Sequence, residues 1–113
     1  MQIKFTSQKG IHNIAADQII RIEALNNYSK IFLANHSTLV VSKVLMWCQN
    51  RLPEQMFTRV HRSHLVNKTY ISEINFGDHK MVRLTNGDKV TISRRKSATT
   101  FKNLAEVKAK HRF

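Results

Sequence analysis

Short runs of alternating apolar and polar residues occupy most of the chain, a pattern typical of half-buried β-strands. The runs are rich in β-branched and aromatic residues, which favours strands over helices. Asn86-Gly87 is the strongest local signal and predicts a type I′ hairpin turn between two of these strands. Asn26-Asn27 and Asn35-His36-Ser37 predict two further turns. The expected strands cover residues 3–5, 11–14, 19–25, 30–34, 38–41, 70–76, 81–84 and 89–92.

Three segments break the alternating pattern. Ser42 is a candidate N-cap for a short helix that Pro53 ends, because proline cannot continue a helical turn. Residues 57–67 are mixed and predict irregular structure or a short helical turn. Residues 97–110 favour a polar helix that docks by one face. The chain is therefore predicted to be mainly β, with eight or more short strands and one or two small helices.

Charge is the strongest feature of the composition. Nineteen Lys and Arg oppose seven Asp and Glu, which gives a net charge of +12 over 113 residues. Such a chain repels itself, so an anionic partner explains the imbalance better than folding does, and nucleic acid is the usual one. The basic residues gather in 59–68 and 89–112, where Glu106 is the one acidic residue. A merely soluble cationic surface is the alternative.

The expected cellular location is inferred from three sequence features: membrane spans, cysteines and a signal peptide. No window reaches the about 18 apolar residues of a membrane span, and no basic amphipathic helix carries aromatic anchors, so no membrane partner is expected. Cys48 is the single cysteine and forms no internal disulfide, which suits a reducing interior. The first ten residues lack the apolar core of a signal peptide. We therefore expect a cytoplasmic protein.

Three polar segments are candidates for nucleic-acid contacts. In 57–67, arginines and histidines are interspersed among apolar residues without a regular period; 93–96 places three cations directly after a strand; and 26–30 forms a polar turn. Arginine matters because its planar fork meets two guanine acceptors or a phosphate at once. The blander alternatives are a basic loop, a solvated charge run and a connecting turn. The candidate residues are Asn27, Tyr28, Ser29, Lys30, Arg59, His61, Arg62, Ser63, Asn67, Lys68, Ser93, Arg94, Arg95 and Lys96.

Other chemistry is poorly supported. His61 and His64 have the spacing of a metal-binding pair, but zinc sites usually need three or four protein ligands and no set is complete. Ser63 lacks the strained elbow of a nucleophile, and no phosphate-cradling motif occurs. We therefore expect neither an enzyme nor a cofactor or metal. An RNA-binding β-domain and a protein-interaction module remain the alternatives to binding of double-stranded DNA.

The ordered motifs resemble the LytTR family, the DNA-binding effector domain of response regulators. The resemblance covers about residues 1–106, which we take as the domain, with 107–113 as a basic tail. The stretches that carry it are Ile22-Glu23-Ala24-Leu25-Asn26-Asn27-Tyr28, Phe57-x-Arg59-x-His61-Arg62-Ser63-His64-Leu65-Val66-Asn67, Ile71-x-x-Ile74, Leu84-x-Asn86-Gly87 and Val90-x-Ile92-Ser93-Arg94-Arg95.

The resemblance implies an elongated fold of about ten strands in three antiparallel sheets, with loops rather than a recognition helix entering the DNA grooves. It places contacts at Tyr28, Ser29 and Lys30 in a first loop and at His61 and Arg62 in a second, which Ser63 and Asn67 shape. A third loop contains Arg95, with Ser93 and Arg94 beside it.

Two positions depart from part of the family, and both bear on the preferred base sequence. Some members have histidine in place of Ser29 and asparagine in place of Arg62. A bidentate guanidinium at Arg62 favours guanine over adenine. The family also implies two copies on neighbouring repeats, about 10–10.5 bp apart, and a receiver or sensor domain or protein as a partner.

Overall fold

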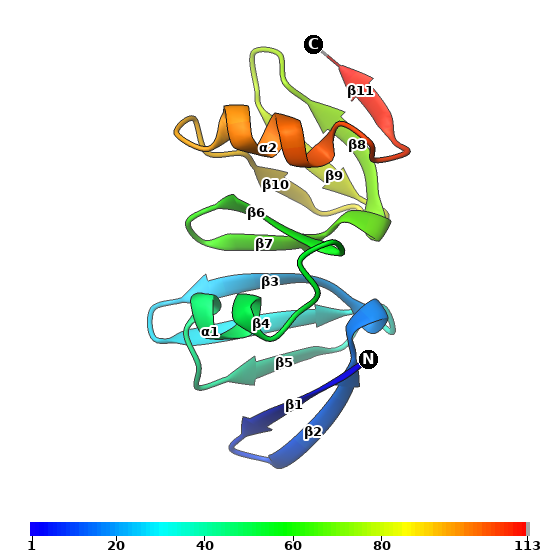
Figure 1. The fold of residues 1–113 in the computed structure, drawn as a ribbon. Helices are drawn as coiled ribbons and strands as arrows, with labels where there is room; N and C mark the ends of the chain where they lie inside the picture. Colours follow the sequence, from blue (N-terminus) through cyan, green and yellow to red (C-terminus); the bar gives the residue numbers. More distant parts are fainter. Residues whose placement is uncertain (113) are drawn as a thin grey trace.

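Three stacked β-sheets form an elongated body in the computed structural model, which describes residues 1–112 and measures 44 × 24 × 22 Å (Figure 1). The sheets have the strand orders β1-β2, β5-β4-β3-β7-β6 and β10-β9-β8-β11. The predicted elongated, mainly β fold with three sheets is thus confirmed. All neighbouring strands in the described part run antiparallel except β11, which pairs in parallel with β8.

The strands are β1 (Gln2–Ser7), β2 (Gly10–Ala15), β3 (Ile19–Leu25), β4 (Tyr28–Leu33), β5 (Thr38–Val41), β6 (Phe57–His61), β7 (His64–Asn67), β8 (Ile71–Asn75), β9 (Met81–Leu84), β10 (Lys89–Thr91) and β11 (Lys110–Arg112). The helices are α1 (Leu45–Asn50) and α2 (Ser97–Leu104), with short 3-10 turns η1 (Ala16–Gln18) and η2 (Lys68–Tyr70).

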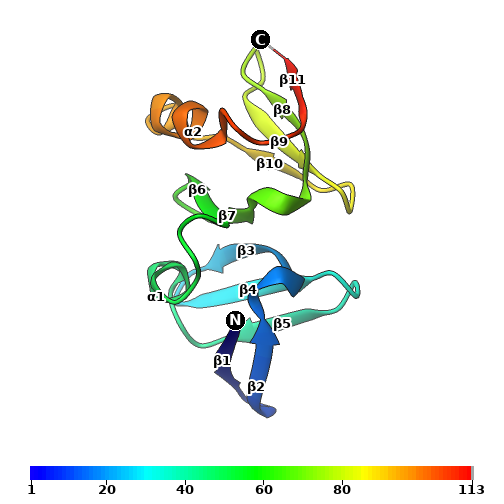
Figure 2. The same ribbon diagram turned by 45° about the vertical axis from the view of Figure 1, so that its right-hand side comes forward.

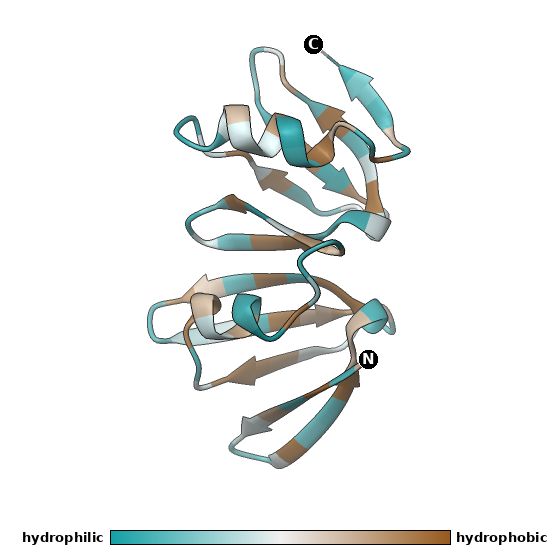
Figure 3. Cartoon of the chain, viewed as in Figure 1, coloured by the Kyte–Doolittle hydropathy of each residue, from teal (hydrophilic) through white to brown (hydrophobic). Residues whose placement is uncertain are grey.

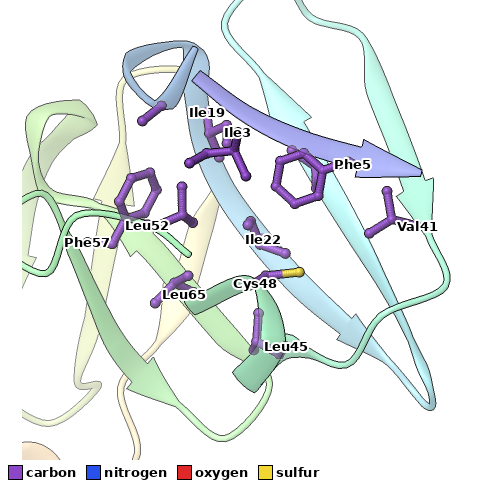
Figure 4. Packing of buried hydrophobic residues seen from close by; sticks show 12 residues of the cluster. Ile3, Phe5, Ile19, Ile22, Val41, Leu45, Cys48, Leu52, Phe57 and Leu65 are labelled. Carbon is purple, nitrogen blue, oxygen red and sulfur yellow. The ribbon is translucent and has the colours of Figure 1, made fainter. Parts of the chain in front are cut away.

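Two hydrophobic cores hold the sheets together. The first lies between the five-stranded sheet, β1 and α1, and Figure 4 shows Phe5, Ile22 and Leu65 packed within it. The second lies between the C-terminal sheet, α2 and the β6–β7 hairpin. Hydrophobic colouring follows the strands that line both cores (Figure 3). Each core is built from one face of alternating strands, as the sequence pattern indicates.

The β6–β7 hairpin contributes to both cores. Leu65 is buried in the first core, and its neighbour Val66 is buried in the second together with Val60. Successive residues of a strand point to opposite faces, so β7 is buried on both faces. The prediction of irregular or helical structure for 57–67 was wrong for this reason. A strand that is buried on both faces shows no alternation of apolar and polar residues.

Two smaller predictions also need correction. Ser42 does not cap the helix, since α1 begins at Leu45 after Val44 and has no side-chain cap. The hairpin at Asn86-Gly87 exists, but it is not type I′, because Gly87 (φ +93°) has a positive φ and Asn86 does not. The Gly87 N–H donates to the Leu84 carbonyl, so the loop is a longer one that ends in a left-handed glycine.

Other local predictions are confirmed. Asn26 (φ +56°) and His36 (φ +70°) take the left-handed backbone of the predicted turns. Helix α2 begins at Ser97 as expected, and its Leu104 is fully buried in the second core. It ends at Leu104, so the helix predicted to reach residue 110 was too long, and Lys110 lies in β11. The expected tail, 107–113, extends one residue beyond the described part of the chain, and its residues Lys110–Arg112 form β11.

The hydrogen bonds of the Asn67 side chain join the end of β7 to the start of β3 and to η2, and their contribution to stability can be tested. Its side chain is fully buried at the end of β7, where Nδ2 donates to the Ile19 carbonyl and Oδ1 accepts from the Thr69 N–H, both at 2.9 Å. We expect Asn67→Ala to lower the free energy of unfolding by about 1–3 kcal/mol, because both backbone groups lose their partner. Urea denaturation measures this loss. Asn13→Ala, on the exposed face of β2, is the control and should change little.

Candidate nucleic-acid interface

Three tips lie along one edge of the molecule: the β3–β4 turn, the β6–β7 turn and the segment 93–96 between β10 and α2. Figures 1 and 2 both show them on the left side, together with α1. Backbone hydrogen bonds connect them in series. The Ala24 N–H donates to the Ser63 carbonyl at 2.9 Å, and the Ser93 N–H donates to the Val60 carbonyl at 2.8 Å. The three segments named from the sequence are therefore brought together.

The first tip is a two-residue turn, since Leu25 pairs with Tyr28 across it. Asn27 and Tyr28 are exposed, and Lys30 is half-buried. Ser29 differs from its neighbours because it is fully buried, and its hydroxyl donates to the Lys43 carbonyl at 2.7 Å. Ser29 therefore anchors the chain entering α1 to this tip, and the exposed side chains beside it are free to reach outward.

The second tip is braced from behind by Arg59. Its Nε donates to the His61 carbonyl at 2.9 Å, its Nη2 to the Arg62 carbonyl, and its Nη1 to Gln49 Oε1 at 2.9 Å. Burial lowers the pKa of Arg59 from its usual value, and the group stays charged at neutral pH. Arg62 is exposed at the apex. One arginine thus holds the turn, and the other projects from it.

Two histidines lie at the base of the same tip. His61 Nδ1 accepts the Ser63 N–H at 3.1 Å, which leaves Nε2 to carry the ring proton. The His61 and His64 rings are 5.2 Å apart. His64 Nδ1 is buried without a hydrogen bond, 3.7 Å from Glu23 Oε1. Burial lowers the pKa of His64, and His61, Arg21 and Arg59 add to this against the opposing effect of Glu23.

The third tip contains Arg94, Arg95 and Lys96, all exposed, after a partly buried Ser93. A shallow cleft lies between β6, η2 and α2. Side chains from the third tip and from residues 57–68 line it, among them Arg59, Lys68, Arg95 and Lys96. Cations that are far apart in sequence therefore line one concave surface. Asn67, in contrast, is buried and fully bonded, so its role is to position η2.

A hollow on the other side of the third tip adds residues that sequence reasoning missed. It is lined by His61, Arg94 and Ser93, and also by His79, Lys80 and Lys89. Lys80 ends the β8–β9 loop, and its carbonyl accepts the Ile92 N–H at 3.0 Å. No motif marks these lysines, because only the pairing of β9 with β10 brings them beside the tips.

Acidic side chains are few near the tips: Glu54 lines the cleft, Asp78 lines the hollow, and Glu23 lies beside His64. Arg21 pairs with Glu23 at 3.2 Å and with Asp88 at 2.9 Å, and Glu73 pairs with Arg83 and Arg112. The tip residues 26–30, 61–63 and 93–96 include no acid. In residues 1–112, no group of three or more His, Cys, Asp or Glu is placed to hold a metal ion. Nor is any helix in that range long and apolar enough to cross a membrane.

Comparison with known proteins gives a consistent picture. The model of the LytTr DNA-binding domain family matches residues 9–106. The sensory transduction protein LytT of Enterococcus faecalis is 30% identical over 94 residues, 81% of this chain and 38% of the relative. The transcriptional regulatory protein LytR of Staphylococcus aureus is 34% identical over 86 residues, 74% of this chain and 35% of the relative. The chain therefore spans less than half the length of these relatives.

A solved structure shares the fold. The LytTr DNA-binding domain of a Bacillus cereus response regulator superposes with a TM-score of 0.79 at 21% identity, and the match covers 91% of this chain and 95% of that one. At this level of identity the likeness concerns the arrangement of the strands and helices.

The buried His64 predicts a pH dependence of stability. Its folded-state pKa is lowered, so its contribution is fully present above the ordinary histidine pKa of about 6.5. That contribution is lost as the pH falls through the lower folded value, because the unfolded chain binds the proton first. We expect the free energy of unfolding to fall less steeply from pH 7.5 to pH 5 in His64→Gln than in the wild type. Equal slopes would contradict this, and His79→Gln, which changes an exposed histidine, is the control.

Proposed function

Because the chain belongs to the LytTr DNA-binding domain family, we propose that it regulates transcription by reading specific double-stranded DNA sites with its three tips. The matched region is a DNA-binding domain and not an enzyme. The observation that carries the finer proposal is the convergence of the tips. Three segments far apart in sequence meet at one edge, and backbone hydrogen bonds fix their relative positions. Their tip residues 26–30, 61–63 and 93–96 include five Lys or Arg and no acid.

General attraction to DNA comes from the cations. Lysines near the tips displace counterions condensed on the phosphates, which supplies affinity independent of sequence. Lys30, Lys68 and Lys96 are suited to this role because they flank the three tips. Lys80 and Lys89 extend the same surface past the third tip.

Sequence readout is assigned to the exposed groups at the tips. Arg62 and Arg95 can each meet the two acceptors of a guanine in the major groove. Arg94, Asn27 and Tyr28 lie beside them, and shorter contacts come from the His61 ring and from Ser63 and Ser93. Three of the predicted contact residues act differently in this proposal. The side chains of Ser29, Arg59 and Asn67 donate hydrogen bonds to backbone carbonyls of the protein itself, so in this proposal they position the tips.

The shape of the domain suits a duplex. Its long dimension of 44 Å exceeds one helical turn of B-DNA, about 34–36 Å. We propose that the tips, which follow one another along the body, contact neighbouring grooves of the duplex. We also propose that two copies bind neighbouring repeats about 10–10.5 bp apart, which would place both on the same face of the duplex.

The biological setting is proposed from the relatives. They are named as a sensory transduction protein and a transcriptional regulator, and this chain spans 38% or less of their length. We propose that residues 1–106 are the DNA-binding unit, with 107–113 as a basic extension that also supplies β11. This unit acts in the cytoplasm under the control of a receiver or sensor domain or protein.

Selection of bound duplexes from a random library tests the proposal. We expect enrichment of a motif in two copies about one helical turn apart, with guanines at the contacted positions. The enriched duplex should resist competition by single-stranded RNA of the same length. Failure to enrich any motif, or equal competition by the RNA, would overturn the proposal.

A substitution at Arg95 tests whether this residue reads the base sequence or only attracts DNA of any sequence. We expect Arg95→Ala to weaken binding to the selected duplex by about 1–3 kcal/mol, because a bidentate base contact is lost. Binding to a scrambled duplex should change much less. Fluorescence anisotropy at fixed salt measures both affinities, and Lys110→Ala, on the distant strand β11, is the control. Equal weakening on both duplexes would show that Arg95 contacts phosphate alone.

A further inference from the structure

Two cationic residues that flank helix α1 lie close to one aromatic ring of that helix. The Arg51 guanidinium carbon lies 4.2 Å from the centre of the Trp47 ring, and Lys43 Nζ lies 5.1 Å from it. Both cationic residues are exposed. Within residues 1–112, no ion pair includes either of them. Lys43, Trp47 and Arg51 together are called the tryptophan platform below.

The tryptophan platform is bonded to two of the three tips. The Ser29 hydroxyl at the first tip donates to the Lys43 carbonyl at 2.7 Å. Arg59, which braces the second tip, donates to Gln49 Oε1 of α1 at 2.9 Å. Figures 1 and 2 both show α1 on the edge that carries the tips. The platform therefore lies beside the first two tips, and hydrogen bonds fix it there.

The Trp47 ring holds the two cations in place before a ligand binds. Trp47 packs on the first core and tilts against Phe5, with 6.1 Å between ring centres, so its position is fixed. A cation over an indole face is attracted by the ring and loses part of its freedom before any ligand arrives. A guanidinium carries five N–H donors, so one held close to a ring can still donate to an anion that approaches from solvent. Helix α1 itself contains no acidic residue to compete.

We propose that Lys43 and Arg51, held on Trp47, bind phosphates of the DNA backbone next to the first two tips. This inference rests on the proposed function and adds α1 to the contact surface. DNA phosphate is the ligand that the placement favours, because the platform shares its edge with the cationic tips. A backbone strand held there would fix how deeply the first two tips enter their grooves.

The salt dependence of DNA affinity tests the inference. Each phosphate contact contributes about 0.9 to the slope of log affinity against log salt. We expect the double variant Lys43→Gln with Arg51→Gln to flatten that slope by about 1.8 on the selected duplex. The matched control removes the same charge at two exposed lysines on distant strands, Lys4→Gln with Lys110→Gln. It should leave the slope near that of the wild type, and thermal melting confirms that both proteins are folded.

Trp47 gives a second readout, because it is the single tryptophan of the chain. Acrylamide quenching of its fluorescence should fall when saturating duplex covers the platform. Unchanged quenching, or a slope in the double variant equal to that of the control, overturns the inference. These results are distinguishable from failure of the proposed function, in which wild-type protein would bind no selected duplex at all. Trp47→Phe, which keeps a ring under the cations, should retain the wild-type salt slope.

Discussion

The burial of β7 on both faces is the constraint on which the interface depends. Leu65 faces the core beneath α1, and Val66 faces the core beneath α2. Each buried aliphatic side chain of this size contributes about 1.5–3 kcal/mol. Sliding the strand by one residue would exchange the two faces and place each side chain in the core that is shaped for the other. The β6–β7 turn is therefore fixed relative to both cores, and the other tips are bonded to this hairpin through Ser63 and Val60.

A net charge of +12 has to be distributed in a way that still permits folding. Three of the acids are used in ion pairs on the strands and turns, where they neutralise Arg21, Arg83 and Arg112. Glu54 and Asp78 line the hollows beside the tips, where the cations outnumber them and repel one another. Bound phosphates would remove that repulsion. The same distribution explains why DNA affinity should depend strongly on salt.

Sequence patterns predicted the strands that have one buried face. They missed the β6–β7 hairpin, in which β7 is buried on both faces. The strands that alternate were found, whereas 57–67 gave no period because residues 65–67 are all buried. Exposed tip residues such as Arg62 and Arg95 were also found. The roles of Ser29 and Asn67 were not decidable, since their partners, the Lys43 and Ile19 carbonyls, lie 14 and 48 residues away. The platform had a signal, because Lys43, Trp47 and Arg51 recur at four-residue, helical spacing.

The hydrogen bonds of Arg59 explain how the β6–β7 turn keeps its shape. A bare hairpin turn presents carbonyl oxygens, which repel phosphates and leave the backbone mobile. Arg59 occupies the carbonyls of His61 and Arg62 from behind and places its charge under the apex. The turn thereby becomes both stiffer and more positive without exposing the arginine that causes it. Arg62 is exposed at the apex of this stiffened turn, so the base contact proposed for it would cost less ordering than the same contact from a flexible loop. Lysine at position 59 would keep the charge but not the planar fork that reaches two carbonyls and Gln49 together. The shape of the guanidinium, more than its charge, is therefore what this position requires.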